Sequence, residues 1–573
     1  MLIAAVAQAE GVMPELAREA VGVKAYPAAP RVSAAVAIAP AAKLGRAEAV
    51  LTEEVHVWNA EGRRPMKNGF TRSLHEMVAV SLNGAAAAKS GPVAHAGGVV
   101  AASSRGLVWS GKFQLDAYAV RLRLDDVKLP AGAVLWVYTD GQTPIAFDRD
   151  LVDQDGGIWT PTVRGGIVHL EIEIPNPKSD AEGASFRVQQ VLELVAPRPS
   201  QPKANDDPVC LVDVQCVDTG TLAEVASFKQ GVAHLQYVKG TGSFVCSGGL
   251  LNDSDPSGFV PYLLTANHCF DSQSSATSLE AYWDWRWASC ETVEIPDFAD
   301  FPRSNGSTLL ATSASSDFTF VRLNSAPANR LFFGWTTTAQ PNGTKLHRIS
   351  HPAPEDFGPL PQMYSSTYVD TNIATCSSVG RPNFVYSRTT GDAEGGVYGG
   401  SSGSLAFTAA GQVVGQLLGS CGPSPADGCN DANSTVDGSF ATTFPSVSQF
   451  LGSGTGGGTC TPGSTVLCLN NGRFKVEATF VAGGQSGTAN VVKLTDETGY
   501  LWFFNASNVE AVVKVVNGCG LNSRFWVFAG GLTDVRVDLR VTDVSKGTVK
   551  TYTNPQGVAF APIQDTGAFA TCP

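Results

Sequence analysis

Three short motifs in the middle of the chain bring together the side chains needed for nucleophilic hydrolysis. His268 ends the sequence Leu-Thr-Ala-Asn-His, Asp317 lies in Ser-Ser-Asp-Phe-Thr, and Ser402 lies in Gly-Gly-Ser-Ser-Gly-Ser. A serine hydroxyl is a weak nucleophile at neutral pH. It therefore needs an imidazole to take its proton and a carboxylate to hold that imidazole in the correct tautomer. The glycines around Ser402 allow the sharp backbone turn that points amides at a developing oxyanion. These residue types predict acyl-transfer chemistry.

The order of these residues along the chain separates two hydrolase architectures. Residues 399–403 also match the G-x-S-x-G nucleophile elbow of α/β-hydrolases, centred on Ser401, but in that fold the acid and the histidine follow the serine. The last histidine of the chain is His351, so the elbow interpretation fails. The order of base, acid and nucleophile is instead that of the chymotrypsin-like proteases, in which two β-barrels each supply part of the triad.

The elements that must position these residues are short β-strands. The chain has 573 residues, 43% of them apolar, and its 60 glycines favour turns over long helices. Residues 119–124 and 167–174 alternate apolar and polar side chains, and residues 134–138 form a short apolar run, which predicts strands. One helix is predicted over residues 445–451. The length suggests roughly three to five domains, and we expect an all-β protein.

Composition excludes several functional classes. The net charge of −12 argues against general nucleic-acid binding, which needs clustered positive charge. No apolar run is long enough to predict a membrane-spanning helix. The twelve cysteines fall in two even groups, eight from Cys210 to Cys429 and four from Cys460 to Cys572, which predicts disulfides and an oxidising compartment. The absence of C-x-x-C pairs argues against zinc, and we expect no metal or other cofactor.

The chain begins with an apolar stretch that ends in Ala7-Gln8-Ala9, a small-x-small pattern that suggests the remnant of a signal peptide and an exported, extracellular protein, with the periplasm as one route. Composition shifts predict the domain boundaries. The expected parts are a signal remnant at 1–9, an N-terminal region at 10–206 with a β-rich domain at about 70–195, a catalytic domain at 207–452, a Gly-rich linker at 453–459, and a β-sandwich-like domain at 460–573.

The central block resembles the trypsin-like serine peptidases, and within them the secreted bacterial lysyl-endopeptidase branch. The similar segments are 210–216 (CLVDVQC), 244–250 (FVCSGGL), 264–269 (LTANHC), 316–319 (SDFT), 400–404 (GSSGS) and 415–417 (GQL). The resemblance covers under half of the chain. It implies a double six-stranded antiparallel β-barrel with the active site in the cleft between the barrels.

The resemblance also implies the role of each site residue. Ser402 would attack the scissile carbonyl, His268 would act as general base and then as general acid, and Asp317 would orient the imidazole. The backbone amides of Gly400 and Ser402 would form the oxyanion hole.

The resemblance further implies which cysteines of the central block pair. The expected disulfides there are Cys246–Cys269, Cys216–Cys290, and Cys210 with either Cys421 or Cys429, with Cys376 taking the one that remains. In the last block, the spacing suggests Cys460–Cys468 and Cys519–Cys572.

The substrate pocket is where this chain departs from the family pattern. A pocket for Lys or Arg needs a buried carboxylate, because an unpaired buried charge is costly. Trypsin carries that acid six residues before the nucleophile, where this chain has Gly396. The lysyl branch carries it where this chain has Thr435, with Asp437 two residues later. Leu418, followed by Gly419, replaces the family's stacking histidine. A basic, a small neutral and an acidic P1 residue therefore all stay open.

These observations predict a secreted serine endopeptidase that acts on proteins or peptides and is made as a precursor with its own N-terminal region as a partner. Ser401 stands where trypsin has the aspartate that binds the new N-terminus. We therefore expect activation by removal of the N-terminal region near residues 203–207, rather than through such an ion pair. The alternative is a secreted adhesin or binding protein that keeps an inactive barrel scaffold, and the complete set of catalytic residue types argues against it.

Overall fold

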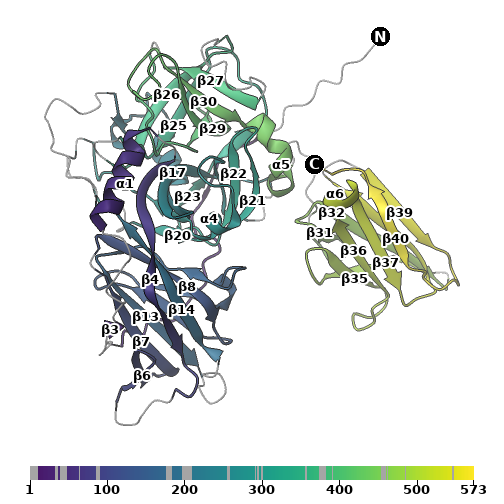
Figure 1. The fold of residues 1–573 in the computed structure, drawn as a ribbon. Helices are drawn as coiled ribbons and strands as arrows, with labels where there is room; N and C mark the ends of the chain where they lie inside the picture. The colour runs from purple at the N-terminus through teal and green to yellow at the C-terminus, as the bar shows by residue number, and fades with distance from the viewer. Residues whose placement is uncertain are drawn as a thin grey trace.

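The computed structural model is built mainly from β-strands, with a few helices (Figure 1). The structure describes residues 11–32, 37–38, 48–62, 65–85, 91–115, 117–175, 183–196, 210–254, 258–290, 292, 296–297, 301–354, 358–372, 383–389, 392–452, 460, 462–483, 485–544 and 548–572. The predicted signal remnant, the processing segment and the Gly-rich linker lie outside these residues. None of the described helices is long and apolar enough to cross a membrane.

Four parts of the chain are named below by their residues. They are the N-terminal segment (residues 11–22), the N-terminal region, a name that from here on means residues 37–196 only, the central region (210–452) and the C-terminal region (460–572).

The first half of the central region is a curled antiparallel sheet that does not close. Its strands are β16 (Val232–Lys239), β17 (Gly242–Leu251), β18 (Tyr262–Ala266), β19 (Glu280–Trp283), β20 (Arg303–Asn305), β21 (Ser307–Ser313) and β22 (Phe318–Leu323). They pair in the order β20-β19-β16-β17-β18-β22-β21. In the described chain no ladder joins β20 to β21, because β20 leads directly into β21 through a left-handed turn at Gly306. One of the two expected closed barrels is therefore a half-barrel.

The second half of the central region forms a closed six-stranded barrel. Its strands are β25 (Lys345–Ser350), β26 (Met363–Val369), β27 (Phe384–Arg388), β28 (Leu405–Phe407), β29 (Gln412–Cys421) and β30 (Ser434–Ser439). The ring runs β25-β26-β27-β30-β29-β28 and returns to β25. The region also contains α3 (Val225–Phe228), α4 (Gln273–Thr277), β15 (Val212–Asp213), β23 (Arg330–Phe332) and β24 (Gly334–Thr336). A half-barrel and a closed barrel together are consistent with a chymotrypsin-like fold.

Helix α5 (Phe440–Leu451) follows the closed barrel and begins five residues earlier than predicted, so Pro445 lies inside it. The helix starts earlier because Phe440 and Phe444 pack into the apolar core around Trp335.

The N-terminal region holds two sheets around one apolar core. The first contains β4 (Met66–Ser81), β8 (Ala119–Lys128), β11 (Ile158–Trp159), β12 (Val163–Arg164) and β14 (Ser185–Leu194). The second contains β5 (Val93–His95), β6 (Gly98–Ala102), β7 (Gly106–Gln114), β9 (Val134–Tyr138), β10 (Ile145–Phe147) and β13 (Ile167–Pro175), with β3 (Ala37–Ile38) at β7. The core between them includes Trp109, Leu122, Leu170 and Phe186. Helix α1 (Glu48–Ala60), which the sequence pattern did not predict, packs on β4.

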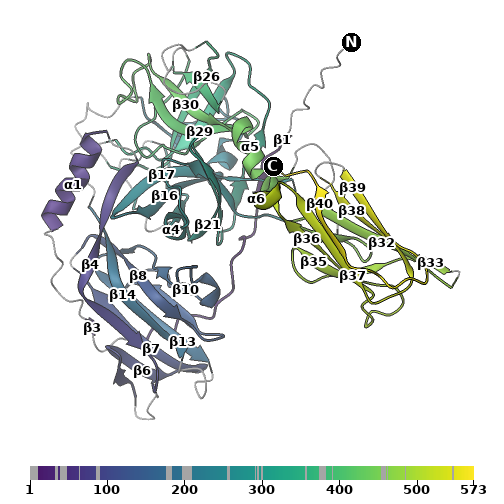
Figure 2. The ribbon, with the colours of Figure 1, turned by 45° about the vertical axis from the view of Figure 1, so that its right-hand side comes forward.

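The first of these sheets continues into the central region. The start of β4 pairs antiparallel with β17, so that Met66 lies opposite Val245 and Phe70 lies opposite Gly242. In Figure 2, β4 begins beside β17 and runs from there into the N-terminal region. The two regions thus share one continuous sheet.

The C-terminal region is a sandwich of two antiparallel sheets. One contains β31 (Leu467–Leu469), β32 (Phe474–Ala482), β33 (Gln485–Thr488), β38 (Arg536–Asp543) and β39 (Thr548–Asn554). The other contains β34 (Asn490–Lys493), β35 (Thr498–Trp502), β36 (Ala511–Asn517), β37 (Phe525–Gly531) and β40 (Ile563–Phe569), and α6 (Cys519–Asn522) precedes β37. Alternate side chains such as Val476, Leu539, Val513 and Val527 form its core, as a period-two pattern requires.

Disulfides join cysteines within the central and C-terminal regions. The described bonds are Cys210–Cys429, Cys216–Cys290, Cys246–Cys269, Cys460–Cys468 and Cys519–Cys572. For Cys210, the structure selects Cys429 over Cys421. Cys421 is also disulfide-bonded, and Cys376 lies outside the described residues.

Candidate active site

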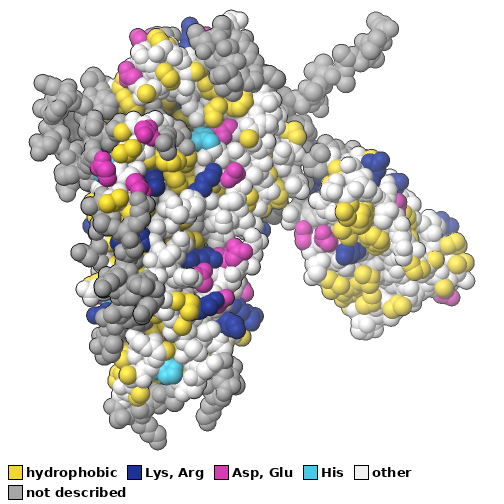
Figure 3. Space-filling model, in the orientation of Figure 1, with side chains coloured by type: hydrophobic (Ala, Val, Ile, Leu, Met, Phe, Trp, Pro, Cys, Tyr) yellow, Lys and Arg dark blue, Asp and Glu magenta, His cyan; other side chains and the backbone are white. Residues whose placement is uncertain are grey.

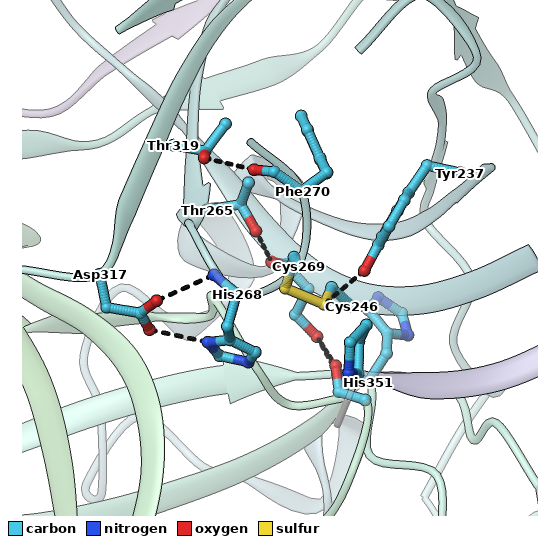
Figure 4. The surroundings of a disulfide bond; sticks show 12 residues. Tyr237, Cys246, Thr265, His268, Cys269, Phe270, Asp317, Thr319 and His351 are labelled. Carbon is cyan, nitrogen blue, oxygen red and sulfur yellow. Dashed lines mark hydrogen bonds and ion pairs between the residues drawn. A yellow bond between two sulfur atoms is a disulfide. The ribbon is translucent and has the colours of Figure 1, made fainter. Parts of the chain in front are cut away.

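The predicted base and acid lie in direct contact at the edge of the half-barrel. His268 follows β18, and Asp317 lies in the turn between β21 and β22. The imidazole Nδ1 lies 2.8 Å from Oδ2 of Asp317, and the backbone N–H of His268 donates to Oδ1 at 2.9 Å (Figure 4). Asp317 has a left-handed backbone, with φ of 50°. A carboxylate held this way fixes the ring orientation and keeps the Nδ1 proton, which leaves Nε2 as the acceptor.

The loop that carries the predicted nucleophile is turned by two left-handed glycines, Gly400 (φ 87°) and Gly403 (φ 78°). A Cβ on Gly403 would collide with the Thr265 hydroxyl, because this loop packs directly on the end of β18, three residues before His268. A Cβ on Gly400 would crowd the His351 carbonyl oxygen. Side chains are excluded at both positions, so the close approach of the loop to the base requires glycine.

Ser402 is largely buried beside this strand end. Its carbonyl accepts a hydrogen bond from the backbone N–H of Ser247 at 2.8 Å, and the Ser247 hydroxyl donates to the Gly400 carbonyl at 2.9 Å. Among the residues that the structure describes, Nε2 of His268 has no hydrogen-bond partner. Catalytic hydrogen bonds are often long before substrate binds, and an unsatisfied Nε2 is the group that can take a hydroxyl proton.

The expected disulfide lies directly behind the histidine. Cys246 in β17 bonds Cys269, the residue after His268, and the Tyr237 hydroxyl lies 3.5 Å from the Cys246 sulfur (Figure 4). His268 therefore lies between strand β18, which precedes it, and Cys269, which the disulfide fixes to β17.

Two groups that the sequence analysis assigned no role hold the acid in place. The Gln416 side chain, in β29, donates to the backbone carbonyls of Ser316 (2.7 Å) and Asp317 (3.2 Å). Gly438, in β30, lies so close to the Ser316 carbonyl that a Cβ there would collide with it. The closed barrel thus positions a carboxylate that belongs to the half-barrel. Gln416 is part of the Gly-Gln-Leu motif, which was the only available signal.

The backbone amides of residues 400–402 differ in whether they have a hydrogen-bond acceptor. The Ser401 amide donates to the Tyr398 carbonyl at 3.1 Å. Within the described chain, the amides of Gly400 and Ser402 on either side donate to no protein acceptor. Ser401 itself is buried, with its hydroxyl 3.0 Å from that of Ser350. Two free amides, one of them that of Ser402 itself, can stabilise a developing negative charge.

The predicted pocket residues do not all lie together. Gly396 and Thr435 line one small cavity, whereas Leu418 packs against Tyr386 and Val436, and Gly419 lies next to open space. The described residues that line this cavity are uncharged: Ser365, Thr367, Thr389, Gly395, Gly396, Val397, Ser420, Gly428, Asn433, Ser434 and Thr435. A Cβ on Gly396 would collide with the Gly428 carbonyl, so an acid could not replace it without a shift.

Asp437 corrects one expectation. Its carboxylate lies 2.6 Å from Nη2 of Arg348, and both side chains are buried. Arg348 also donates to the carbonyl (2.8 Å) and hydroxyl (3.0 Å) of Ser404. Asp437 is therefore the counter-ion of an internal arginine, not an acid free to bind a basic substrate side chain. Arg348 was missed because nothing in its local sequence marks it as a partner of a residue 89 positions away.

Known proteins match this part of the chain. The lysyl endopeptidase C-terminal domain family matches residues 204–436, which include His268, Asp317 and Ser402. The lysyl endopeptidase of Pseudomonas aeruginosa is 22% identical over 345 residues, which are 58% of this chain and 71% of that protein. These matches support a serine-type peptidase.

Two bacterial proteases are among the solved structures that match part of this chain. The active form of a protease from M. tuberculosis shares 14% identity, with a TM-score of 0.27 over 41% of this chain and 88% of that one. The protease Anisep from Arthrobacter nicotinovorans shares 13% identity, with a TM-score of 0.26 over 37% of this chain and 90% of that one.

Proposed function

We propose that this protein is an exported serine endopeptidase, made as a precursor, in which His268, Asp317 and Ser402 form the catalytic triad. The observation that carries the proposal is the 2.8 Å contact between Nδ1 of His268 and Asp317, with Nε2 free of a partner among the described residues. It is supported by the packing of the Ser402 loop, at Gly403, on Thr265, three residues before the base. The oxidising compartment that the disulfides require supports export.

The reaction uses each group in two half-reactions. Ser402 Oγ attacks the peptide carbonyl as His268 Nε2 takes its proton, and the resulting oxyanion lies against the amides of Gly400 and Ser402. The imidazolium, stabilised by Asp317, gives the proton to the leaving amine, so the C–N bond breaks and an acyl-enzyme remains. Water then attacks the ester with His268 again as base, which releases the acid and restores Ser402.

The P1 pocket takes a small or uncharged side chain. The cavity beside Gly396 and Thr435 is lined by uncharged described residues, and the nearby Asp437 is already paired with Arg348. A lysine or arginine side chain would bury its charge there without a counter-ion, which costs several kcal/mol. Asp437→Asn distinguishes this from a basic pocket. We expect it to lower stability with no change in P1 preference, whereas a selective loss of cleavage after Lys and Arg would contradict the neutral pocket.

The N-terminal region acts as a propeptide that covers the approach to the site. Met66, where β4 begins, contacts Val245 and Ala353, and the Ala353 amide donates to the Gly399 carbonyl at 2.5 Å. β4 therefore occupies an edge of β17 one residue before the Cys246–Cys269 bond. An extended substrate could pair with that edge only once β4 has left it. Cleavage near residues 203–207 starts this release.

The test is to incubate the precursor and a Ser402→Ala copy with a denatured protein and to map the new termini by mass spectrometry. We expect cuts only from the Ser402 form, mainly after small or uncharged residues. A fluorophosphonate probe should label the parent and Ser401→Ala but not Ser402→Ala. Absence of cuts and of labelling, after the N-terminal region has been removed, would favour the inactive binding protein.

A further inference from the structure

The N-terminal segment lies against strands β23 and β24 of the central region, from which more than 300 residues separate it in the sequence. β1 (Gly11–Val12) pairs antiparallel with β24, and β2 (Glu15–Ala17) pairs antiparallel with β23. Further along, Val21 and Ala326 exchange two backbone hydrogen bonds of 2.9 and 2.8 Å. The segment therefore adds strand pairing to the linker between the two barrels.

The central region is shaped to receive this segment. A Cβ on Gly334 would collide with the Val12 carbonyl, and one on Gly411 would collide with Phe228 and also crowd Pro14. Ala17 is 2% exposed and belongs to the same apolar core as Phe332. Glycines at the contacts and an alanine at the core position allow close backbone approach, as in an internal strand.

Polar side chains of the central region complete the contact. The Asn252 amide donates to the Met13 carbonyl at 3.1 Å, and the Gln412 amide lies 3.4 Å from the Val12 carbonyl. Gly22 has a left-handed backbone, and a Cβ there would crowd the Asn324 carbonyl. The contact thus uses main-chain groups along the whole segment and ends at a turn.

After that turn the chain contacts the N-terminal region instead of the central region. Val23 is 57% exposed, and Lys24 then pairs with Asp148 (2.8 Å) and Asp150 (2.7 Å) of the N-terminal region. In Figure 2 the purple chain runs down from β1 toward β10. The contacts with the central region therefore end before Val23, and the contacts with the N-terminal region begin after it.

We propose that the surface formed by β23, β24 and Ala326 is a binding site for residues 11–22, which stay on the central region as a separate peptide when the chain is cut after them. The occupant is this segment of the protein's own chain. If the N-terminal region is excised, a step that rests on the proposed processing, the product is a two-chain enzyme with this peptide in place.

The experiment uses the full chain with Ser402→Ala, so its result does not depend on peptidase activity. A cleavage site for a foreign protease of narrow specificity is inserted after Val23, the protein is immobilised through its C-terminus, and the site is cut. We expect one peptide per chain to survive washing in native buffer and to leave only in denaturant, as measured by mass spectrometry. Loss of the peptide in native buffer would overturn the proposal.

Two neighbouring substitutions make the result specific. Ala17→Glu places a charge at a core position, so we expect it to release the cut peptide at least about tenfold faster. Leu16→Glu is the matched control, because Leu16 is 38% exposed, and it should retain the peptide as the parent does. If Ala17→Glu fails to fold, exchange of the parent's peptide against an isotope-labelled copy measures the same release. Equal release from all forms would contradict the assigned site.

Discussion

The N-terminal and C-terminal regions are both β-structures next to the central region, yet they are attached in opposite ways. The N-terminal region shares a sheet with the central region through β4 and β17. In the C-terminal region, the described strands pair only with one another, and two disulfides lie within it. In Figure 3 it stands beside the rest of the molecule and shows groups of hydrophobic side chains, drawn in yellow, on its surface. Leu521 and Leu532 are among its exposed apolar residues.

A buried charge cluster makes the first attachment specific. Arg121 of the N-terminal region lies 3.3 Å from Glu280 of β19, and both side chains are buried. The Thr162 hydroxyl donates to Glu280 at 2.5 Å, and Arg303 donates to the Thr162 carbonyl at 2.7 Å. Burial raises the pKa of Glu280, but Arg121 and Arg303 outweigh it and hold the pKa below its usual value. One region thus shares a sheet and a buried charge cluster with its neighbour, whereas the described strands and disulfides of the other lie within that region.

The largest effect should come from breaking this cluster. Glu280→Ala leaves Arg121 buried without its counter-ion, and we expect about 3–5 kcal/mol of destabilisation, measured by urea unfolding of the Ser402→Ala precursor. The matched control is Glu477→Ala in the C-terminal region, which removes the partly exposed 2.9 Å pair with Lys475 and should cost at most about 1 kcal/mol. Similar losses in both variants would contradict the difference between the two attachments.

Core truncations should show which regions unfold together. Leu122 and Leu501 are fully buried leucines in the N-terminal and C-terminal regions, and either change to Ala should cost about 2–5 kcal/mol. We expect Leu122→Ala to lower the unfolding temperature of the central region as well, because the two regions share a sheet. Leu501→Ala should lower only a separate C-terminal transition in calorimetry. One transition shifted equally by both variants would refute the separation.

Acid should destabilise the central region more than the C-terminal region. Burial lowers the pKa of His351, which stacks on Trp285, from 6.5 to about 3, and no histidine follows it in the chain. Between these values the unfolded chain binds a proton that the native state refuses, so stability falls as pH falls through this window. From pH 7 to pH 5 we expect about 2 kcal/mol from this group. Burial also lowers the pKa values of His234 and His347, so the central region has further acid-sensitive groups. His351→Gln, followed by urea unfolding, should reduce the pH dependence by about the share of His351, and an unchanged slope would exclude His351 as a source.

The smallest effect should come from the exposed ion pairs that Lys24, which follows the N-terminal segment, makes with the N-terminal region. Lys24→Ala removes ion pairs that are largely open to solvent, so we expect a loss of at most about 1 kcal/mol, and less at high salt. Urea unfolding at low and high ionic strength measures it. A loss as large as that of Glu280→Ala would show that the Lys24 ion pairs, and not the shared sheet, hold the N-terminal region in place.

Local patterns predicted a large part of the site. The His268 and Asp317 contact and the left-handed glycines at 400 and 403 follow from motifs in which a few adjacent residues carry the whole requirement. The pairing of Asp437 could not be predicted, because its partner, Arg348, comes from another strand of the closed barrel. A strand pattern says which side chains face inward, but not which distant charge they meet there.

The sequence alone determined the β-class, through its alternating strands and glycine turns, and the order of base, acid and nucleophile along the chain. The tertiary structure decided what pairs over long distances. It closed one barrel and left the other open, joined β4 to β17, and seated Ala17 in a core formed by residues hundreds of positions away. The physical reason is that turns and strands depend on neighbouring residues, whereas any exposed strand edge can accept many partners until folding selects one.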